Sequence, residues 1–396
     1  MSILHDEHWA KWRTSIEQPM DAGLQEHDHL SFLRHFSGSI LPRKLSVGTD
    51  CSGIEAPVHA LELLGIEVDH KFSSDIDPEV IKSIQANYEP DRIYTDIMAR
   101  NHKTLPHVDL YVAGFPCQSF SMLGKREGFN NPTKGAIFFE CWQTIKSCEP
   151  KIYILENVKG LVNHDGGKTY KTIMDHLKKI RNYHVFADVY NTADYGLPQN
   201  RERIYIIGLH KKHFNSNFTK PEPIPLEITV GDLIDRTVGR DTSYGNITEH
   251  KLNVLQDLIK IGKIDDIDQP WCVNLNVSSA QRSAPKKNIC PCLLAGSSTY
   301  YYTPIRRRFT PREYLRIQGF SDSFKQVVKD GKMYKQVGNS MSTSVLCFIY
   351  QMIFYCAKSK PKIRINIKLK STSNMCHNSR TDAQNDGMQR PIVTLA

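Results

Sequence analysis

Apolar runs alternate with helical patterns between residues 44 and 211, and this alternation limits the folds open to the chain. The apolar runs predict strands at 44–49, 68–75, 108–114, 151–157 and 202–208. Helical patterns lie between them near 55–65, 135–148 and 168–181. Strands and helices that alternate in this way predict an α/β fold with a doubly wound, mostly parallel sheet.

Local signals mark where helices begin and end. Gly65 is placed to close the helix that starts near residue 55. Asp77 followed by Pro78 predicts an N-cap and a first-turn proline. The stretch TPRE, residues 310–313, predicts a helix start with a capping box between Thr310 and Glu313. Residues 338–358 predict one largely buried helix.

The alternation fails from residue 212 to residue 300, where prolines at 221, 223 and 225 interrupt the pattern. We interpret 212–300 as a separate small domain inserted into the α/β unit, which then comprises 44–211 and 301–357. Residues 1–43 predict a polar N-terminal extension. Residues 358–396 are basic and then polar, and we expect this tail to be disordered.

Composition sets broad limits. The 396 residues carry a formal net charge of +9, which is compatible with a polyanionic partner but is shared by many other proteins. The 10 cysteines form no paired C-x-x-C motif, and Cys290-Pro291-Cys292 lacks a second pair for zinc, so we predict no metal site. No signal peptide opens the chain and no apolar run is long enough for a membrane span. We therefore expect an intracellular protein with no membrane partner; cytoplasm and nucleus are not distinguished.

Open α/β sheets bind ligands at the carboxyl ends of their strands. The predicted strands end in groups that can bind a ligand or take part in catalysis: a glycine turn, carboxyl groups, a thiol and two guanidinium groups. These are Gly53, Asp75, Asp96, Pro116-Cys117, Glu156-Asn157, Arg201 and Arg203. Their convergence on one edge of one sheet favours a site more strongly than any one of them does.

Each of these residues also has a plain structural explanation. Gly53 suits an ordinary turn equally well, and Asp75 suits either the two hydroxyls of a ribose or a surface position. Cys117 taken alone fits an inert buried thiol. Glu156 is harder to explain structurally because it closes the apolar run 152–155, and a buried carboxyl group needs a partner. Arg201 and Arg203 could serve only to neutralise it.

Several segments resemble, in order, the motifs of the cytosine-C5 DNA methyltransferases. They are GFPCQSFSMLG (114–124), ENVKG (156–160), QNRERIYIIG (199–208), RRFTPREYLRIQGF (307–320) and QVGNSMSTS (336–344). TKGAIFFE (133–140) fits a further motif that usually begins with arginine and here has Lys134. The resemblance covers about 44–357 and implies the fold of S-adenosylmethionine-dependent methyltransferases with a small target-recognition domain.

The resemblance implies S-adenosyl-L-methionine as cofactor. The positions that match its site are Cys51, Gly53, Asp75, Ile76, Asp96, Ile97, Pro116, Asn339 and Ser340. Two positions depart from the family pattern. Cys51 stands where the family usually has a phenylalanine that stacks on the adenine, and Glu55 stands where it usually has a second glycine.

The resemblance also implies a covalent mechanism. Cys117 would add to carbon 6 of a cytosine flipped out of the duplex, so that carbon 5 can attack the methyl group. Pro116 would fix the direction of Cys117. Glu156 would share a proton with ring nitrogen 3, while Arg201 and Arg203 would orient Glu156 and favour the thiolate. The base that removes the carbon-5 hydrogen is not identified.

Double-stranded DNA is the implied partner, and we expect a monomer. The segment 212–300 would read the sequence, with cations at Lys211, Lys212, Arg240, Lys251, Lys260, Arg282, Lys286 and Lys287. Three alternatives stay open: a methyltransferase of the same fold that acts on tRNA, a catalytically silent nucleic-acid-binding relative, and a cysteine hydrolase, which would need a histidine near Cys117. The DNA sequence read and the biological role, in restriction-modification, a virus or a nuclear genome, also stay open.

Overall fold

A computed structural model describes residues 43–116, 136–296 and 298–359. The predicted N-terminal extension, Cys117 and all of the tail beyond 359 lie outside the described residues. None of the described helices is long and apolar enough to span a membrane.

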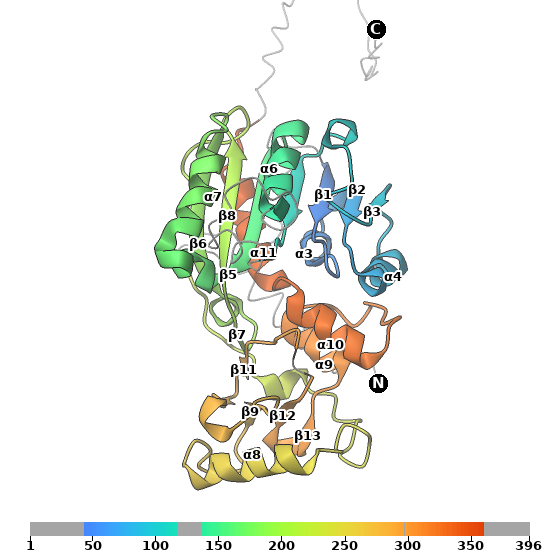
Figure 1. The fold of residues 1–396 in the computed structure, drawn as a ribbon, viewed down its shortest axis with the longest axis vertical. Coiled ribbons are helices and arrows are strands. Elements are labelled where there is room, and N and C mark those ends of the chain that lie inside the picture. Colours follow the sequence, from blue (N-terminus) through green and yellow to red (C-terminus); the bar gives the residue numbers. More distant parts are fainter. Residues whose placement is uncertain (1–42, 117–135, 297, 360–396) are drawn as a thin grey trace, which may run out of the picture. The chain divides into compact units, whose positions relative to one another are not determined.

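A seven-stranded sheet forms the centre of the α/β unit, in the order β3-β2-β1-β4-β5-β8-β6 (Figure 1). The pairs from β3 to β5 are all parallel, whereas β8 runs antiparallel to both β5 and β6. The sheet is thus mostly parallel, as predicted. Its strands are β1 (Lys44–Asp50), β2 (Glu67–Ser74), β3 (Ile93–Tyr94), β4 (Leu110–Ala113), β5 (Ile152–Val158), β6 (Tyr183–Asn191) and β8 (Glu202–His210).

Helices cover both faces of this sheet because its central strands are apolar on both sides. Along β4, Leu110 and Val112 join one core cluster while Tyr111 and Ala113 join the other. The first cluster contains α3 (Ala56–Leu63) and α11 (Thr343–Tyr355), and the second contains α6 (Ala136–Cys148) and α7 (Lys168–Lys178) (Figure 1). The doubly wound architecture is therefore confirmed.

The predicted helix boundaries are confirmed where a local cap defines them. The carboxylate of Asp77 accepts a hydrogen bond from the backbone N–H of Glu79 at 3.0 Å, at the start of α4 (Pro78–Asn87). At α9 (Pro311–Gln318), the hydroxyl of Thr310 accepts from the backbone N–H of Glu313, whose carboxylate accepts from the N–H of Thr310. The TPRE capping box is therefore present in both directions.

The single helix predicted over 338–358 is wrong in its first part. α10 (Asp330–Asn339) ends before Ser340, whose backbone is extended, and α11 starts at Thr343. The carbonyl oxygen of Ser340 accepts hydrogen bonds from the side chains of Arg201 and Gln318, at 2.6 and 2.9 Å. These partners replace the helical hydrogen bond that this carbonyl would otherwise receive. The motif GNSMSTS is therefore a helix break.

The segment predicted as a small domain contains a separate sheet and one hydrophobic cluster confined to it, while its other apolar residues join the core of the α/β unit. Its four strands run β10 (Lys286–Lys287), β9 (Trp271–Asn274), β12 (Tyr300–Tyr302) and β13 (Arg307–Arg308). The helix α8 (Glu249–Lys260) packs on it through Val254, Leu255 and Leu258. The sheet crosses the boundary that we predicted at residue 300, because β12 pairs with β9. The small sheet therefore extends to Arg308.

A second, two-stranded sheet joins the small domain to the α/β unit. Here β11 (Cys290–Pro291) pairs in parallel with β7 (Gln199–Asn200). The side-chain amide of Gln199 also accepts from the backbone N–H of Leu293 and donates to the carbonyl of Ile317. The segment after β11 is thus held directly beside Arg201.

Candidate active site

One cavity of about 440 Å³ lies at the carboxyl ends of β1, β2, β4 and β5. It collects most of the residues singled out from the sequence: Cys51, Gly53, Asp75, Ile76, Asp96, Ile97, Pro116, Glu156, Arg201, Arg203 and Asn339. Ser340 is buried beside the cavity and is not part of its described lining. Cys117 lies outside the described residues, directly after Pro116, which is exposed.

Glu156 is the buried carboxylate of the cavity, at the end of β5. Nε of Arg203 lies 3.2 Å from its Oε1. Burial raises the pKa of Glu156, and the charges of Arg203 and Arg201 offset only part of that rise. A carboxyl group whose pKa is raised in this way can hold and release a proton closer to neutral pH than an exposed glutamate.

Asn157 positions the end of the neighbouring strand. Its side-chain amide donates a hydrogen bond of 2.8 Å to the carbonyl of Phe115, and both residues are buried. Phe115 precedes Pro116 and Cys117, so this bond fixes the backbone that leads to the predicted nucleophile. From the sequence, Asn157 was predicted only as a neighbour of Glu156, and its place in the ENVKG motif was the available signal.

The two arginines have different partners, although we predicted that both orient Glu156. Arg201 is 2% exposed, and its guanidinium donates to three backbone carbonyls, those of Leu293, Gly338 and Ser340, at 2.9, 3.2 and 2.6 Å. It acts on Glu156 through its charge, whereas Arg203 makes the direct contact. Arg201 thus ties the segment after β11 to the break between α10 and α11.

Asp75 and the turn after β1 form the other half of the cavity. One carboxylate oxygen of Asp75 accepts from the backbone N–H of Gly53 at 3.1 Å and the other from the N–H of Asp77 at 3.0 Å. Gly53 has a φ of 56°, a conformation that glycine adopts without strain. Beside them, Ile76 is 78% exposed and offers an apolar surface at the cavity.

Cys51 also belongs to this turn, and its thiol is unreactive. Burial raises its pKa well above the usual range, so the thiol stays protonated. The positive φ of 48° at this residue is unusual outside glycine and reflects the tightness of the turn. Cys51 is therefore placed as a wall of the cavity.

Glu55 lies behind the same turn, fully buried and with a φ of 59°. Its Oε1 accepts hydrogen bonds from the hydroxyls of Thr49 and Ser73, at 2.7 and 2.6 Å. Burial raises its pKa to about 7, although these hydrogen bonds oppose the rise. The carboxyl group thereby joins the ends of β1 and β2.

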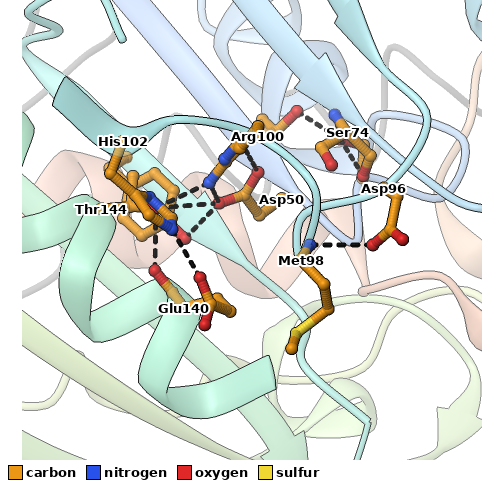
Figure 2. A network of polar contacts seen from close by, with 11 residues as sticks. Asp50, Ser74, Asp96, Met98, Arg100, His102, Glu140 and Thr144 are labelled. Atoms are coloured by element: carbon orange, nitrogen blue, oxygen red, sulfur yellow. Dashed lines mark hydrogen bonds and ion pairs between the residues drawn. The ribbon is translucent and has the colours of Figure 1, made fainter. Parts of the chain in front are cut away.

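The loop after β3 supplies the third wall. Asp96 accepts from the backbone N–H of Met98 at 2.8 Å, and Arg100 reaches back to Asp50 at the end of β1 (Figure 2). Lys335 and Gln336, both on α10, also line the cavity; neither was named from the sequence as a site residue, although Gln336 opens the motif QVGNSMSTS. Nζ of Lys335 lies 2.9 Å from the carboxylate of Asp77, and an amphipathic helix gives no sequence signal for such a contact.

The cavity fits S-adenosylmethionine by the chemistry of its lining. The cofactor combines a cationic sulfonium with an adenosine, and the cavity combines Asp75, Asp96 and Glu156 with the apolar surfaces of Ile76 and Ile97. The amide nitrogen of Gln336 is buried and has no partner among the described residues, so this wall keeps a free hydrogen-bond donor. Carboxylates favour a cation, and the apolar surfaces favour a purine ring.

Comparison with known proteins places the chain in a family. The family model of C-5 cytosine-specific DNA methylases matches residues 50–355. The Type II methyltransferase M1.ScrFI of Lactococcus lactis subsp. cremoris is 34% identical over 310 residues, which cover 73% of each chain. The Type II methyltransferase M.HpaII of Haemophilus parainfluenzae is 36% identical over 295 residues, 69% of this chain and 80% of the relative.

Solved structures agree with the fold. The Dnmt2 methyltransferase of S. pombe superimposes with a TM-score of 0.54 at 18% identity, over 78% of this chain and 98% of that one. A Spodoptera frugiperda DNMT2 mutant gives 0.57 at 16% identity, over 78% and 99%. Such low identities show the fold alone. The sequence relatives and the family model show more: the chain belongs to the C-5 cytosine-specific DNA methylases, enzymes that methylate carbon 5 of cytosine in DNA.

Proposed function

We propose that this chain methylates a cytosine flipped out of double-stranded DNA, through a covalent bond to Cys117 and with S-adenosylmethionine as methyl donor. The observation that carries the proposal is the contact between Glu156 and Arg203 in the same cavity as Asp75 and Asp96. The carboxyl group of Glu156, whose pKa is raised by burial, thus lines the same cavity as the residues that we assign to the cofactor.

Glu156 is the proposed acid and base for ring nitrogen 3. The thiolate of Cys117 adds to carbon 6, and the electrons move towards nitrogen 3, where the carboxyl group of Glu156 shares its proton. Arg203 holds the carboxyl group in place through its 3.2 Å contact. Positioned proton transfer of this kind contributes about 10²–10⁴-fold to a rate.

Carbon 5 becomes nucleophilic once the thiolate has added to carbon 6. S-adenosylmethionine supplies an electrophilic methyl group. Carbon 5 would form the new bond to that methyl as the methyl–sulfur bond breaks and S-adenosylhomocysteine leaves. The proton at nitrogen 3 would return to Glu156, and a base would then remove the carbon-5 proton. The electrons of that C–H bond expel the Cys117 thiolate from carbon 6, which restores the aromatic ring and the free thiol.

Five residues of this chain are proposed to hold the cofactor: Gly53, Asp75, Ile76, Asp96 and Asn339. The carboxylate of Asp75 is suited to ribose hydroxyls because it is rigidly held by two backbone N–H groups. Ile76 offers the exposed apolar surface against which a purine packs. Cys51 contributes a smaller contact than the phenylalanine usual in the family.

The small domain is proposed to read the DNA. Its exposed cations are Lys212, Arg236, Arg240, Lys260, Arg282, Lys286 and Lys287. Phosphate contacts by these residues would give an affinity that falls as salt rises.

The test is bisulfite sequencing of a randomised DNA pool after incubation with the purified protein and S-adenosylmethionine. We expect methylcytosine within one short sequence context. Cys117→Ser should abolish it and leave circular dichroism unchanged, since a hydroxyl preserves size but not nucleophilicity. Methylation by Cys117→Ser at the wild-type rate would disprove the covalent mechanism. Methyl transfer to tRNA with none to DNA would replace the proposed substrate.

A further inference from the structure

A buried ion pair lies behind the cofactor half of the cavity. Asp50 is the last residue of β1, directly before the turn with Cys51 and Gly53, and Arg100 ends the loop that carries Asp96. Both terminal nitrogens of Arg100 donate to the carboxylate of Asp50, one of them at 2.5 Å (Figure 2). The two side chains are 2% and 0% exposed.

Further groups converge on the same carboxylate. The hydroxyl of Tyr111 on β4 donates to Asp50 at 2.7 Å, and the hydroxyl of Thr144 on α6 lies 3.4 Å from it. Arg100 also donates to Thr144 at 2.6 Å. The pair therefore joins the end of β1 and the loop after β3 to the strand and the helix that pack beside them.

Arg100 also lies over two neighbouring aromatic rings. Its guanidinium carbon lies 5.4 Å from the centre of the Phe72 ring and 5.3 Å from that of the Tyr94 ring. A guanidinium held by a bidentate contact and by two aromatic rings has little freedom to move. The loop that carries Arg100 is therefore fixed as well.

Stability alone is a poor explanation for this arrangement. Taking two charges out of water costs free energy that their attraction often only balances, and apolar side chains frequently do as well. What a buried pair does supply is a defined geometry between the segments that carry its partners. Here those segments are two walls of one cavity, the turn at Gly53 and the loop at Asp96.

We infer that Arg100 and Asp50 are positioning residues for the cofactor, which hold the loop of Asp96 and Ile97 at a fixed spacing from the turn of Cys51 and Gly53. The described lining of the cavity contains neither Arg100 nor Asp50. The pair therefore acts on the cofactor through the loop and the turn whose positions it fixes. The spacing matters more in this chain because Cys51 has no ring to fill a widened gap. The inference rests on the proposed use of S-adenosylmethionine.

Calorimetric titration of purified variants with S-adenosylmethionine and with S-adenosylhomocysteine tests the inference. Arg100→Met should weaken both affinities by about tenfold or more, because it removes the bidentate contact and leaves the carboxylate of Asp50 without a cation. Both ligands should lose affinity by the same factor, since the pair fixes spacing and does not face the sulfonium. Arg100→Lys should cause an intermediate loss, because an ammonium keeps the charge without the planar fork.

Arg92 provides the matched control. Its guanidinium lies over the same Tyr94 ring, 5.7 Å from the centre, but it is exposed and donates to the Tyr94 hydroxyl instead of to Asp50. Arg92→Met should leave both affinities unchanged. The amides of Met98 and Ala99 should exchange with deuterium faster in Arg100→Met than in Arg92→Met.

The possible results distinguish a failure of the inference from a failure of the proposed function. If Arg100→Met lowers the melting temperature but binds both ligands as the wild type does, the pair is purely structural and the inference fails while the proposed function stands. Should Arg100→Met not fold, Arg100→Lys and Asp50→Asn decide in the same way. Wild-type protein that binds neither ligand would overturn the proposed function and the inference together.

Discussion

Nε of Arg203 lies 3.2 Å from Oε1 of Glu156, and this contact does not cancel the effect of burial on the carboxyl group. The pKa of Glu156 stays raised because desolvation outweighs the charges of Arg203 and Arg201. The site therefore keeps a carboxyl group that can exchange a proton, held in place by a cation.

Glu156→Gln tests the role of that proton. We expect methyl transfer to fall by about 10²–10⁴-fold, because the amide keeps the shape but cannot exchange a proton. Affinity for S-adenosylmethionine, measured by calorimetry, should stay at the wild-type value. The matched control is Glu202→Gln, which removes an exposed carboxylate paired with Lys159 and should keep the full rate. Equal rates for the two variants would make Glu156 structural.

Arg203→Met should raise the pKa of Glu156 further, since it removes the nearer of the two cations that lower it. Carbon-13 NMR of protein labelled at the glutamate carboxyl groups, with Glu156→Gln to assign the signal, measures that pKa directly. A titration midpoint equal to that of the wild type would show that Arg203 does not stabilise the charged form.

Arg201→Met should act on stability instead. Three backbone carbonyls lose a buried charged donor, which we expect to lower the free energy of unfolding by about 3 kcal/mol or more. Urea denaturation measures the free energy of unfolding of Arg201→Met and of Arg203→Met, and we expect the larger loss in Arg201→Met. If Arg203→Met proves the less stable of the two, the assignment of these roles is reversed.

Asp75→Ala should weaken cofactor binding by about tenfold or more, through the loss of hydrogen bonds to a charged acceptor. Asp91→Ala is the control, because Asp91 is exposed and pairs with Lys71 away from the cavity. Calorimetry with S-adenosylhomocysteine compares the two. An unchanged affinity in Asp75→Ala would mean that the ribose binds elsewhere.

Glu55 should make the stability of the protein depend on pH. Its pKa is about 7 in the folded chain, above the ordinary value of 4.5, so the folded state keeps a proton that the unfolded state releases. The contribution of Glu55 to the free energy of unfolding is fully present below pH 4.5. It is lost as the pH rises to about 7, and the loss is about 3 kcal/mol. Glu55→Gln should remove this decline, as measured by urea unfolding between pH 5 and pH 8. Parallel curves for the two proteins would contradict the raised pKa.

Much of the fold follows from signals that act within a few residues. The continuous apolar runs, bounded by turn residues, indicated most strands of the large sheet. The caps at Asp77 and Thr310 needed only the next turn of the helix. Because parallel strands end at one edge of a sheet, their order also placed Asp75, Asp96 and Glu156 near one another before any side-chain contact was known. The strand β6 escaped prediction because most of its residues are half-buried and mix polar with apolar side chains.

Most partners of the charged groups were decided by the tertiary structure. Arg201 and Arg203 are two residues apart, yet one binds carbonyls at Leu293 and Ser340 and the other binds Glu156. Arg100 meets Asp50 across 50 positions of sequence. Sequence determined the elements and the edge where they end, because periodicity and caps are local. Packing decided which long side chain reaches which acceptor, because a flexible arginine has several acceptors within reach and only the assembled core selects one.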